Sequence, residues 1–254
     1  MTTEWYILYP ALFITAFFAG LVDSIAGGGG LITVPVMLGL GLPPQVALGT
    51  NKLQASFGSF TAAYYYTRHS VVDLKKARTG IFFTLIGSAF GTLLVQLADP
   101  DMLRRAIPFI LAVILLYIIF KPAVGDQDAV PRLSPLPFFI GFGLALGFYD
   151  GFLGPGVGTF WTIALVVLLG QSLLTATGCT KVMNFTSNIT SLAVFMIGGN
   201  IIYSLGLVMA AGQTLGARAG SKLVIRKGAK LIRPVFITMV TLTLLKLLYD
   251  QYLR

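Results

Sequence analysis

Charged residues are scarce in this chain of 254 residues: Asp, Glu, Lys and Arg together make up 11% of it, against about 25% in a soluble domain. Hydrophobic residues make up 56%, and the mean hydropathy is +0.85. Because so few charges cannot cover a water-facing surface, lipid must surround most of the chain. The composition therefore excludes an ordinary soluble domain and predicts an all-α polytopic membrane protein.

Cysteine and histidine occur once each, as Cys179 and His69. A single cysteine excludes an intramolecular disulfide and a thiolate metal cluster within one chain. Without a cluster of His, Cys, Asp and Glu, metal catalysis is unsupported. A catalytic triad is unsupported as well, because Ser24, Ser187 and Ser191 have no histidine in plausible reach. The sequence also lacks the G-x-x-x-x-G-K-[ST] loop of ATP-driven proteins. We therefore expect no enzyme activity, no metal site and no cofactor.

The formal net charge is nevertheless +9. A basic chain can bind nucleic acid, but here the Lys and Arg residues lie in short loops between apolar segments, as the positive-inside rule describes. We therefore expect the lipid bilayer, and no nucleic acid, as the partner of this charge. The N-terminus lacks the basic region of a signal peptide, so no cleavage is expected.

One sequence motif occurs once in each half of the chain. It is an aspartate followed four positions later by a glycine-rich break. The two versions are Asp23-Ser-Ile-Ala-Gly27-Gly-Gly-Gly30 and Asp150-Gly-Phe-Leu-Gly154-Pro-Gly-Val-Gly158. Irregular backbone inside a membrane is tolerated only where protein buries it or where it lines a cavity. Glycine-interrupted apolar segments at corresponding positions of two halves are the usual pointer to the binding site of a transporter.

The pattern of apolar segments supports this interpretation. Segments 31–42, 137–150 and 157–170 are short for the ~20 residues of a membrane-spanning helix, and we interpret them as half-helices, re-entrant limbs or spans of a thinned membrane. The other segments are 7–25, 46–66, 79–98, 104–120, 174–197, 201–220 and 232–250.

Further matches between the halves predict two transmembrane repeats, 1–120 and 137–254, joined by a polar linker at 121–136. Gly49-Thr-Asn-Lys52 corresponds to Gly178-Cys-Thr-Lys181, and Gly87-Ser-Ala-Phe-Gly91 corresponds to Gly212-Gln-Thr-Leu-Gly216. The basic connections are not equivalent in the two halves: 68–78 is basic in the first, whereas its counterpart near 198–200 is uncharged and 218–233 is basic. If basic loops face the cytoplasm, the repeats are inverted, each has an odd number of crossings, the linker is cytoplasmic and both termini lie outside.

The glycine-rich breaks are candidates for binding an anion. Glycine accepts positive φ and lets the backbone approach a ligand, and consecutive N–H groups or the start of a following helix can hold an anion. The alternative is close helix packing, which we favour for the paired glycines 87/91 and 212/216. For the two breaks we favour a substrate role, and the candidate binding glycines are Gly28, Gly29, Gly30, Gly154 and Gly156.

Lys52 and Lys181 each lie about six residues, or roughly 9 Å, inside an apolar segment. A charge inside the membrane marks a functional site by default. One such lysine could extend to the interface, but two at equivalent repeat positions indicate a shared task. With Asn51, Thr180 and Asn184 beside them, they would suit an anion that has several oxygen atoms.

Asp23 and Asp150 end the segments that lead into the two breaks. They could relay protons, act as fixed counter-ions of the lysines, or cap the N–H groups of the loops. The sequence leaves these three roles open.

These motifs resemble those of the sulfite exporter TauE/SafE family, also called the TSUP transporters. The resemblance lies in Gly20-Leu-Val-Asp23-Ser-Ile-Ala-Gly-Gly-Gly-Gly30, Gly49-Thr-Asn-Lys52-Leu-Gln54, Gly147-Phe-Tyr-Asp150-Gly-Phe-Leu-Gly154-Pro155, and Thr180-Lys181 with Thr186-Ser-Asn188. It implies a permease of the bacterial inner membrane for sulfite, sulfonates or related organic anions. The second break departs from the four-glycine run, so the two half-sites need not be equivalent.

The sequence thus predicts a secondary transporter of a small anionic substrate. It would work by alternating access and be driven by a proton or ion gradient. Two alternatives remain open at this point: a passive anion channel, in which the lysines form a selective ring, and a non-transporting membrane subunit of a larger complex.

Overall fold

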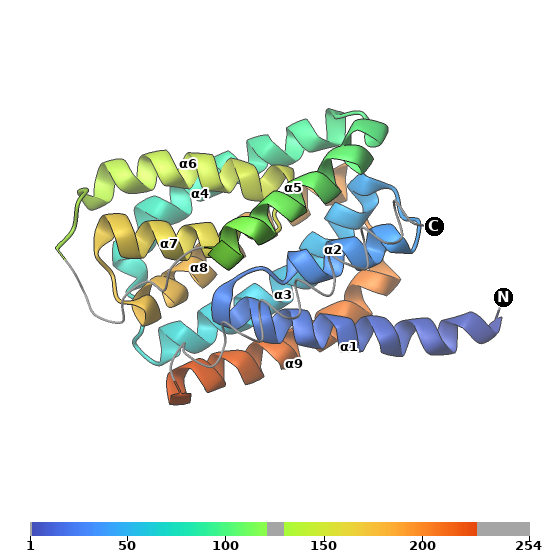
Figure 1. Cartoon of the computed structure of the whole chain (residues 1–254), viewed down its shortest axis with the longest axis horizontal. Helices are drawn as coiled ribbons and strands as arrows, with labels where there is room; N and C mark the ends of the chain where they lie inside the picture. Colours follow the sequence, from blue (N-terminus) through green and yellow to red (C-terminus); the bar gives the residue numbers. More distant parts are fainter. Residues whose placement is uncertain (1, 121–129, 228–254) are drawn as a thin grey trace.

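The computed structural model describes residues 2–120 and 130–227, and within these residues the chain forms nine α-helices and no strand. The predicted tenth segment, 232–250, and most of the predicted linker, 121–136, lie outside the described residues. The helices form a bundle whose members run roughly along its long axis (Figure 1). Their bounds are α1 Thr2–Ala26, α2 Gly30–Gly39, α3 Pro44–Arg68, α4 Leu74–Leu97, α5 Pro100–Phe120, α6 Pro135–Phe152, α7 Val157–Leu169, α8 Leu173–Ile197 and α9 Tyr203–Lys227.

The outer helices carry the apolar surface that a bilayer requires. Three of the described helices are long and apolar enough to cross a membrane, over Tyr6–Ala26, Leu74–Leu97 and Pro135–Phe152. Large apolar side chains stand exposed along several helices, including Phe60, Phe82, Phe90, Phe109 and Leu215. In water this exposed apolar surface would promote aggregation, whereas in a bilayer it contacts the lipid tails. The prediction of an all-helical polytopic membrane protein is therefore confirmed.

Two of the three short segments stay short. Helix α2 has 10 residues and α7 has 13, too few to cross the hydrocarbon core. The prediction for 137–150 was wrong: this segment belongs to α6, which has 18 residues and is long enough to span. The helix starts earlier, with Pro135 at its first position, and it continues past Asp150 because the charge of that residue is paired inside the protein.

Glycines let the outer helices pack backbone to backbone. A Cβ on Gly87 or Gly91 of α4 would collide with the backbone of α6, and a Cβ on Gly212 or Gly216 of α9 would collide with that of α1. The predicted packing role of these four glycines is confirmed. Helix α4 thus pairs with α6, and α9 pairs with α1, so each pair joins the first half of the chain to the second.

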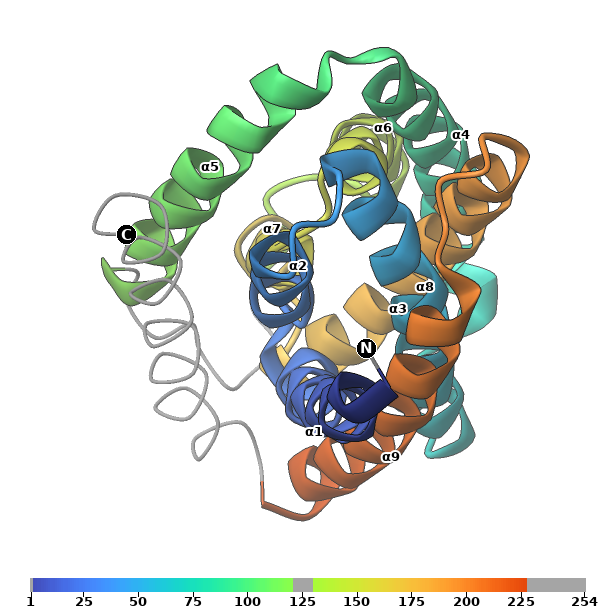
Figure 2. The same cartoon turned by 90° about the vertical axis from the view of Figure 1, so that its right-hand side faces the viewer.

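Helices α3 and α8 lie inside this frame (Figure 2). Both have 25 residues, and both bury their polar side chains. Their polar faces are turned inward, whereas large apolar side chains such as Phe60 of α3 and Ile189 of α8 are exposed on their outer faces. The buried polar side chains are Gln45, Thr50, Asn51, Lys52, Gln54, Ser56 and Ser59 in α3, and Thr177, Thr180, Lys181, Asn184, Thr186, Ser187, Asn188 and Ser191 in α8.

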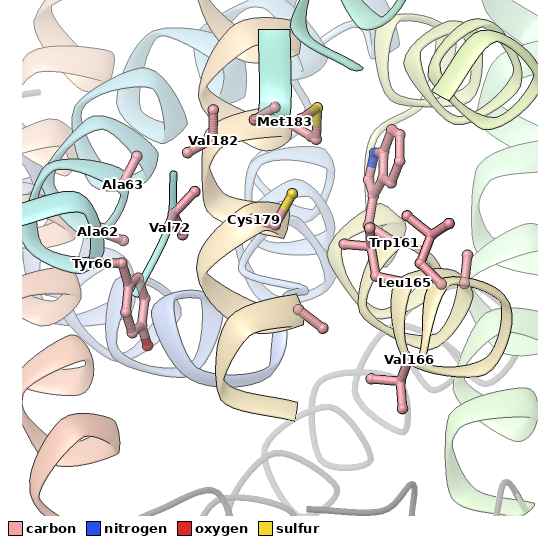
Figure 3. Close-up of a cluster of buried hydrophobic side chains, with 14 of the residues drawn as sticks. Ala62, Ala63, Tyr66, Val72, Trp161, Leu165, Val166, Cys179, Val182 and Met183 are labelled. Carbon is pink, nitrogen blue, oxygen red and sulfur yellow. The ribbon is translucent and has the colours of Figure 1, made fainter. Parts of the chain in front are cut away.

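The largest apolar cluster fixes α7 and α8 in place. Figure 3 shows α8 between side chains of α3 on one side and of α7 on the other. Tyr66 of α3 and Trp161 and Leu165 of α7 have no measurable exposure. Close van der Waals packing of these large side chains, which is what drives helix association in a membrane, holds the short helix α7 in place despite its length.

Candidate functional site

Each glycine-rich break is a sharp reversal of the chain between a long helix and a short one. After α1 ends at Ala26, Gly27 and Gly28 have φ of 76° and 123°. After α6, Gly154 and Gly156 have φ of 92° and 83°. Side chains with a Cβ rarely adopt these values, so glycine is required at the turns themselves. Both breaks return the chain toward the end of the bundle from which it entered (Figure 1).

The two breaks meet in the middle of the bundle. A Cβ on Gly158 would lie 2.8 Å from the Cα of Gly27, so their backbones are in direct contact. Thr159 Oγ1 donates hydrogen bonds to the carbonyl oxygens of Ala26 and Gly27, at 3.2 and 3.4 Å. Helices α2 and α7 overlap when seen down the long axis (Figure 2) but lie apart along it (Figure 1). Their N-terminal ends therefore face the same point from opposite directions.

A cavity of about 30 Å³ lies at this point. One water needs roughly 10–15 Å³ of such volume, so the cavity holds about two waters or one small ion. Eight of the predicted site residues line it: Asp23, Gly28, Gly30, Asn51, Asp150, Gly154, Gly156 and Asn184. The remaining four, Gly29, Lys52, Thr180 and Lys181, do not line it, and the lining residues that sequence reasoning missed are Ala55, Val157, Gly158, Asn188 and Gln213.

Lys52 is paired with the aspartate of the other half. Its Nζ lies 2.6 Å from Asp150 Oδ1 and 2.6 Å from the Asp150 carbonyl oxygen, and it also donates to Asn188 Oδ1 at 3.2 Å. The two charged side chains are 2% and 4% exposed. The second carboxylate oxygen of Asp150 accepts a hydrogen bond from Ser187 Oγ. The lysine therefore holds the second break to α3.

Lys181 makes the reciprocal pair. Its Nζ lies 3.3 Å from Asp23 Oδ2 and donates to the Asp23 carbonyl oxygen. Asp23 Oδ1 also accepts hydrogen bonds from the N–H groups of Gly28 and Gly29, at 3.0 and 3.1 Å. The sequence left three roles open for the aspartates. In the structure both aspartates lie beside a lysine as its counter-ion, and Asp23 also caps backbone N–H groups. Two lysines and two aspartates leave the site with no net charge from side chains.

Threonines tie each short helix to the long helix beside it, at corresponding positions. Thr33 Oγ1 of α2 donates to Asn51 Oδ1 of α3 at 2.6 Å. Thr162 Oγ1 of α7 lies 3.0 Å from Thr180 Oγ1 of α8. This contact explains why Thr180 is buried away from the cavity, whereas the longer Asn51 both meets its threonine and lines the cavity.

Several polar groups at the cavity have no partner. The first N–H groups of a helix have no intrahelical acceptor, and those of Gly30 and Gly158 take none among the described hydrogen bonds between backbone groups outside the helices. Asn184 Oδ1 and Gln213 Oε1 are buried without a hydrogen-bond partner in the described part of the chain. The positive ends of two helix dipoles converge here. The arrangement can therefore hold a small ligand that has negative oxygens and also offers a hydrogen-bond donor.

The missed residues differ in how far the sequence could have revealed them. Lys181, Asn184 and Asn188 recur at spacings of three and four, which places them on one face of a helix. This periodicity could have added Asn188 to the predicted site. Gln213 lies among small residues of α9 and has no counterpart of its kind in the first half of the chain, so the sequence carried no comparable signal for it.

The two ends of the bundle are closed differently. At the end that holds the uncharged 198–200 connection, Ile202 N donates to Thr50 Oγ1 at 3.0 Å and Asn200 Nδ2 donates to Gln96 Oε1 at 3.1 Å. At the other end, where the basic connection between α3 and α4 and the end of α9 lie together (Figure 1), a cavity of about 520 Å³ opens beside Cys179 and Gln171. In the aligned segments Gly49-Thr-Asn-Lys52 and Gly178-Cys-Thr-Lys181, Cys179 corresponds to Thr50.

Comparison with known proteins identifies the family. A family model described as "Sulfite exporter TauE/SafE" matches residues 12–247. The chain belongs to the sulfite exporter TauE/SafE family. Its relatives within this family include a "Probable membrane transporter protein" of Haemophilus influenzae, 46% identical over 244 residues that cover 96% of both chains. "Probable membrane transporter protein YfcA" of Escherichia coli K12 is 46% identical over 246 residues, 97% of this chain and 91% of that protein.

The TauE/SafE family extends beyond bacteria: "Sulfite exporter TauE/SafE family protein 5" of Arabidopsis thaliana is 31% identical over 100 residues, 39% of this chain and 22% of that protein. No solved structure matches the chain. The resemblance predicted from the motifs is confirmed, and the chain is a multi-pass membrane transporter of the TauE/SafE family and not an enzyme.

Proposed function

We propose that this TauE/SafE-family transporter is a secondary transporter that carries small anions, sulfite or small sulfonates, through one site between two inverted repeats. The observation that carries the proposal is the convergence of the N-terminal ends of α2 and α7 on one small, buried, polar cavity. Helix N-termini that meet at the middle of a membrane protein are a recurring way to bind an anionic group.

The sign of the ligand follows from which charges are already neutralised. Lys52 and Lys181 are paired with Asp150 and Asp23, so the side chains alone favour neither sign. The unpartnered N–H groups at the starts of the two helices then determine the sign of the ligand's charge, and they favour a negative one. In this proposal the lysines hold the two breaks in position and offset the aspartates, and they contribute to anion binding through their field.

The packing of the bundle supports inverted repeats and alternating access. Each of the helix pairs α1–α9 and α4–α6 joins one helix of the first half to one helix of the second. Each of the two Lys–Asp pairs also joins the two halves. The bond between Thr33 and Asn51 recurs 129 positions later as the contact between Thr162 and Thr180. Two repeats built alike but pointing in opposite directions can rock about a shared central site. The unequal ends of the bundle agree with one stage of such a cycle.

The proposed orientation places the basic end in the cytoplasm of a bacterial cell and the N-terminus outside the inner membrane. Its support is the position of the basic connection between α3 and α4 at the same end as the close of α9 (Figure 1). A protease-cleavable tag fused before Thr2 would test it. Cleavage in intact spheroplasts is expected, whereas protection until the membrane is lysed would reverse the orientation.

Flux in proteoliposomes tests the function directly. Purified protein is reconstituted, and the uptake of labelled sulfite and methanesulfonate is measured with and without an imposed pH gradient. A secondary transporter gives saturable flux that the gradient accelerates. Flux that ignores the gradient and does not saturate would favour the channel, and no flux of any small anion would contradict transport of this class.

The lysines provide the matching point test. Lys52→Ala and Lys181→Ala should each weaken anion affinity, because each leaves an aspartate uncompensated beside the cavity. Lys75→Ala is the control, because Lys75 is an exposed lysine of the basic connection. If both site variants bind anions as tightly as the control, the proposed site is wrong.

A further inference from the structure

Gln213 is the most unusual side chain at the central cavity. It comes from α9, is 2% exposed, and lines the cavity together with the two breaks. Three glycines make room for it. A Cβ on Gly58 of α3 would collide with its Cγ and lie 2.9 Å from its Nε2, and a Cβ on Gly29 would lie 3.3 Å from the same nitrogen. A Cβ on Gly20 of α1 would meet its backbone. The fold therefore clears a slot through which this amide reaches the cavity.

The first repeat has no equivalent of this amide. In the aligned phrases Gly87-Ser-Ala-Phe-Gly91 and Gly212-Gln-Thr-Leu-Gly216, the residue that corresponds to Gln213 is Ser88. Ser88 Oγ donates to the carbonyl oxygen of Leu85 within its own helix, at 3.1 Å, and does not line the cavity. The cavity is therefore asymmetric, with the extra amide on the α9 side.

The unpartnered acceptors at the cavity indicate which groups a ligand would offer. Gln213 Oε1 and Asn184 Oδ1 are buried acceptors without a hydrogen-bond partner among the described residues, and a buried acceptor that stays unsatisfied is costly. A fully deprotonated oxyanion cannot satisfy an acceptor, because it has no hydrogen to donate. The carboxylates of Asp23 and Asp150 also line the cavity, and with Lys52 and Lys181 they sum to zero charge. This balance suits a monoanion better than a dianion.

We propose that Gln213 determines specificity by accepting a hydrogen bond from a protonated oxygen of the bound anion. The preferred ligand class is then a singly charged oxyanion that keeps one O–H group, such as hydrogen sulfite. Its charged oxygens face the N–H groups at the starts of α2 and α7, and its O–H group faces the amide. This inference rests on the proposed function, since it names the ligand class of the same site.

Two small monoanions separate the contributions of charge and of the O–H group. Hydrogen sulfite has the O–H group, and methanesulfonate has the same charge without it. Binding of both to purified protein in detergent is measured by calorimetry at a pH below the second ionisation of sulfite. The wild-type protein should bind hydrogen sulfite about tenfold more tightly, the size expected for one buried hydrogen bond that the weaker ligand leaves unmade.

The variant Gln213→Met keeps the length and volume that fill the glycine slot but removes the amide. It should lower the ratio of the two affinities to about one, chiefly by weakening hydrogen sulfite. Gln171→Met is the matched control. Gln171 Oε1 is also buried without a partner in the described residues, but it lies at the other cavity, so this variant should keep the wild-type ratio.

The pH dependence in the wild-type protein is an independent test that needs no variant. As pH rises through the second ionisation of sulfite, affinity for total sulfite should fall in proportion to the remaining hydrogen sulfite. Methanesulfonate does not titrate in this range, so its affinity reports any titration of Asp23, Asp150, Lys52 or Lys181 and corrects for it.

The outcomes separate this inference from the proposed function. Equal wild-type affinities for the two anions, or a ratio that survives Gln213→Met, would overturn the role of Gln213 while leaving anion transport intact. Wild-type protein that binds neither anion would overturn both. If Gln213→Met does not fold, equal wild-type affinities for the two anions, or an affinity for total sulfite that does not fall as pH rises, would still overturn the inference.

Discussion

Lys52→Met removes the ammonium group of the most enclosed charge pair and keeps most of the aliphatic stem. Asp150 is then left without its cation in a site where its side chain is 4% exposed, with Ser187 and main-chain groups as its neighbours. Breaking a buried ion pair from one side costs about 3–5 kcal/mol, because the remaining charge is uncompensated. We expect Lys52→Met and Asp150→Asn each to lower the free energy of unfolding by an amount of this order.

The double variant is the decisive measurement. When both charges are gone, no uncompensated charge remains, so the double variant should be more stable than the sum of the single losses predicts, by about 2–3 kcal/mol. Unfolding of the four proteins in mixed micelles, followed by tryptophan fluorescence, gives this interaction energy. Lys75→Met serves as a surface control. Single losses that simply add would refute the pairing of α3 with the second break.

Other predictions follow from the packing. Gly91→Val should cost about 3 kcal/mol of stability, because its side chain meets the backbone of α6. Gly141→Val is the control: a Cβ there meets nothing within 4 Å, and Val is a slightly better helix former than Gly, so no loss of stability is expected. Similar losses for both variants would argue against close packing of α4 on α6. Tyr149→Phe removes a 2.7 Å hydrogen bond to a carbonyl of the second break and should cost about 1 kcal/mol, so unchanged thermal stability and anion affinity would show that the bond is dispensable. A small methanethiosulfonate reagent should modify native Cys179, which lies beside the open cavity, about tenfold faster than the cysteine at position 50 of a Thr50→Cys, Cys179→Thr variant. Mass spectrometry measures both rates, and equal rates would contradict the unequal closure of the two ends.

The breaks themselves were predictable because their cause is local. A glycine run such as Gly27–Gly30 inside an apolar segment has few explanations, and the observed φ values at the turns supply the reason. The spacing of the paired glycines likewise predicted close packing, because a four-residue interval places both on one helix face. Local backbone chemistry was therefore enough to locate the two breaks that line the central cavity.

The sequence alone could not predict which lysine pairs with which aspartate. Lys52 and Asp150 are 98 positions apart, and nothing in either neighbourhood states which aspartate faces which lysine. The same pairing misled the estimate of where α6 ends, because an aspartate in an apolar segment looks like a terminus until its partner is known. Gln213 escaped notice for a related reason: its importance comes from three glycines on other elements.

The contacts between the two halves of the chain have a consequence for membrane insertion during synthesis. During synthesis Lys52 enters the membrane before Asp150 has left the ribosome, and α1 waits for α9, which begins at Tyr203. An isolated lysine in hydrocarbon is costly, so we expect the early helices to stay at the translocon or with an insertase until the second half arrives. Ribosome-stalled chains that end before and after residue 150, cross-linked from position 52, would reveal that delay.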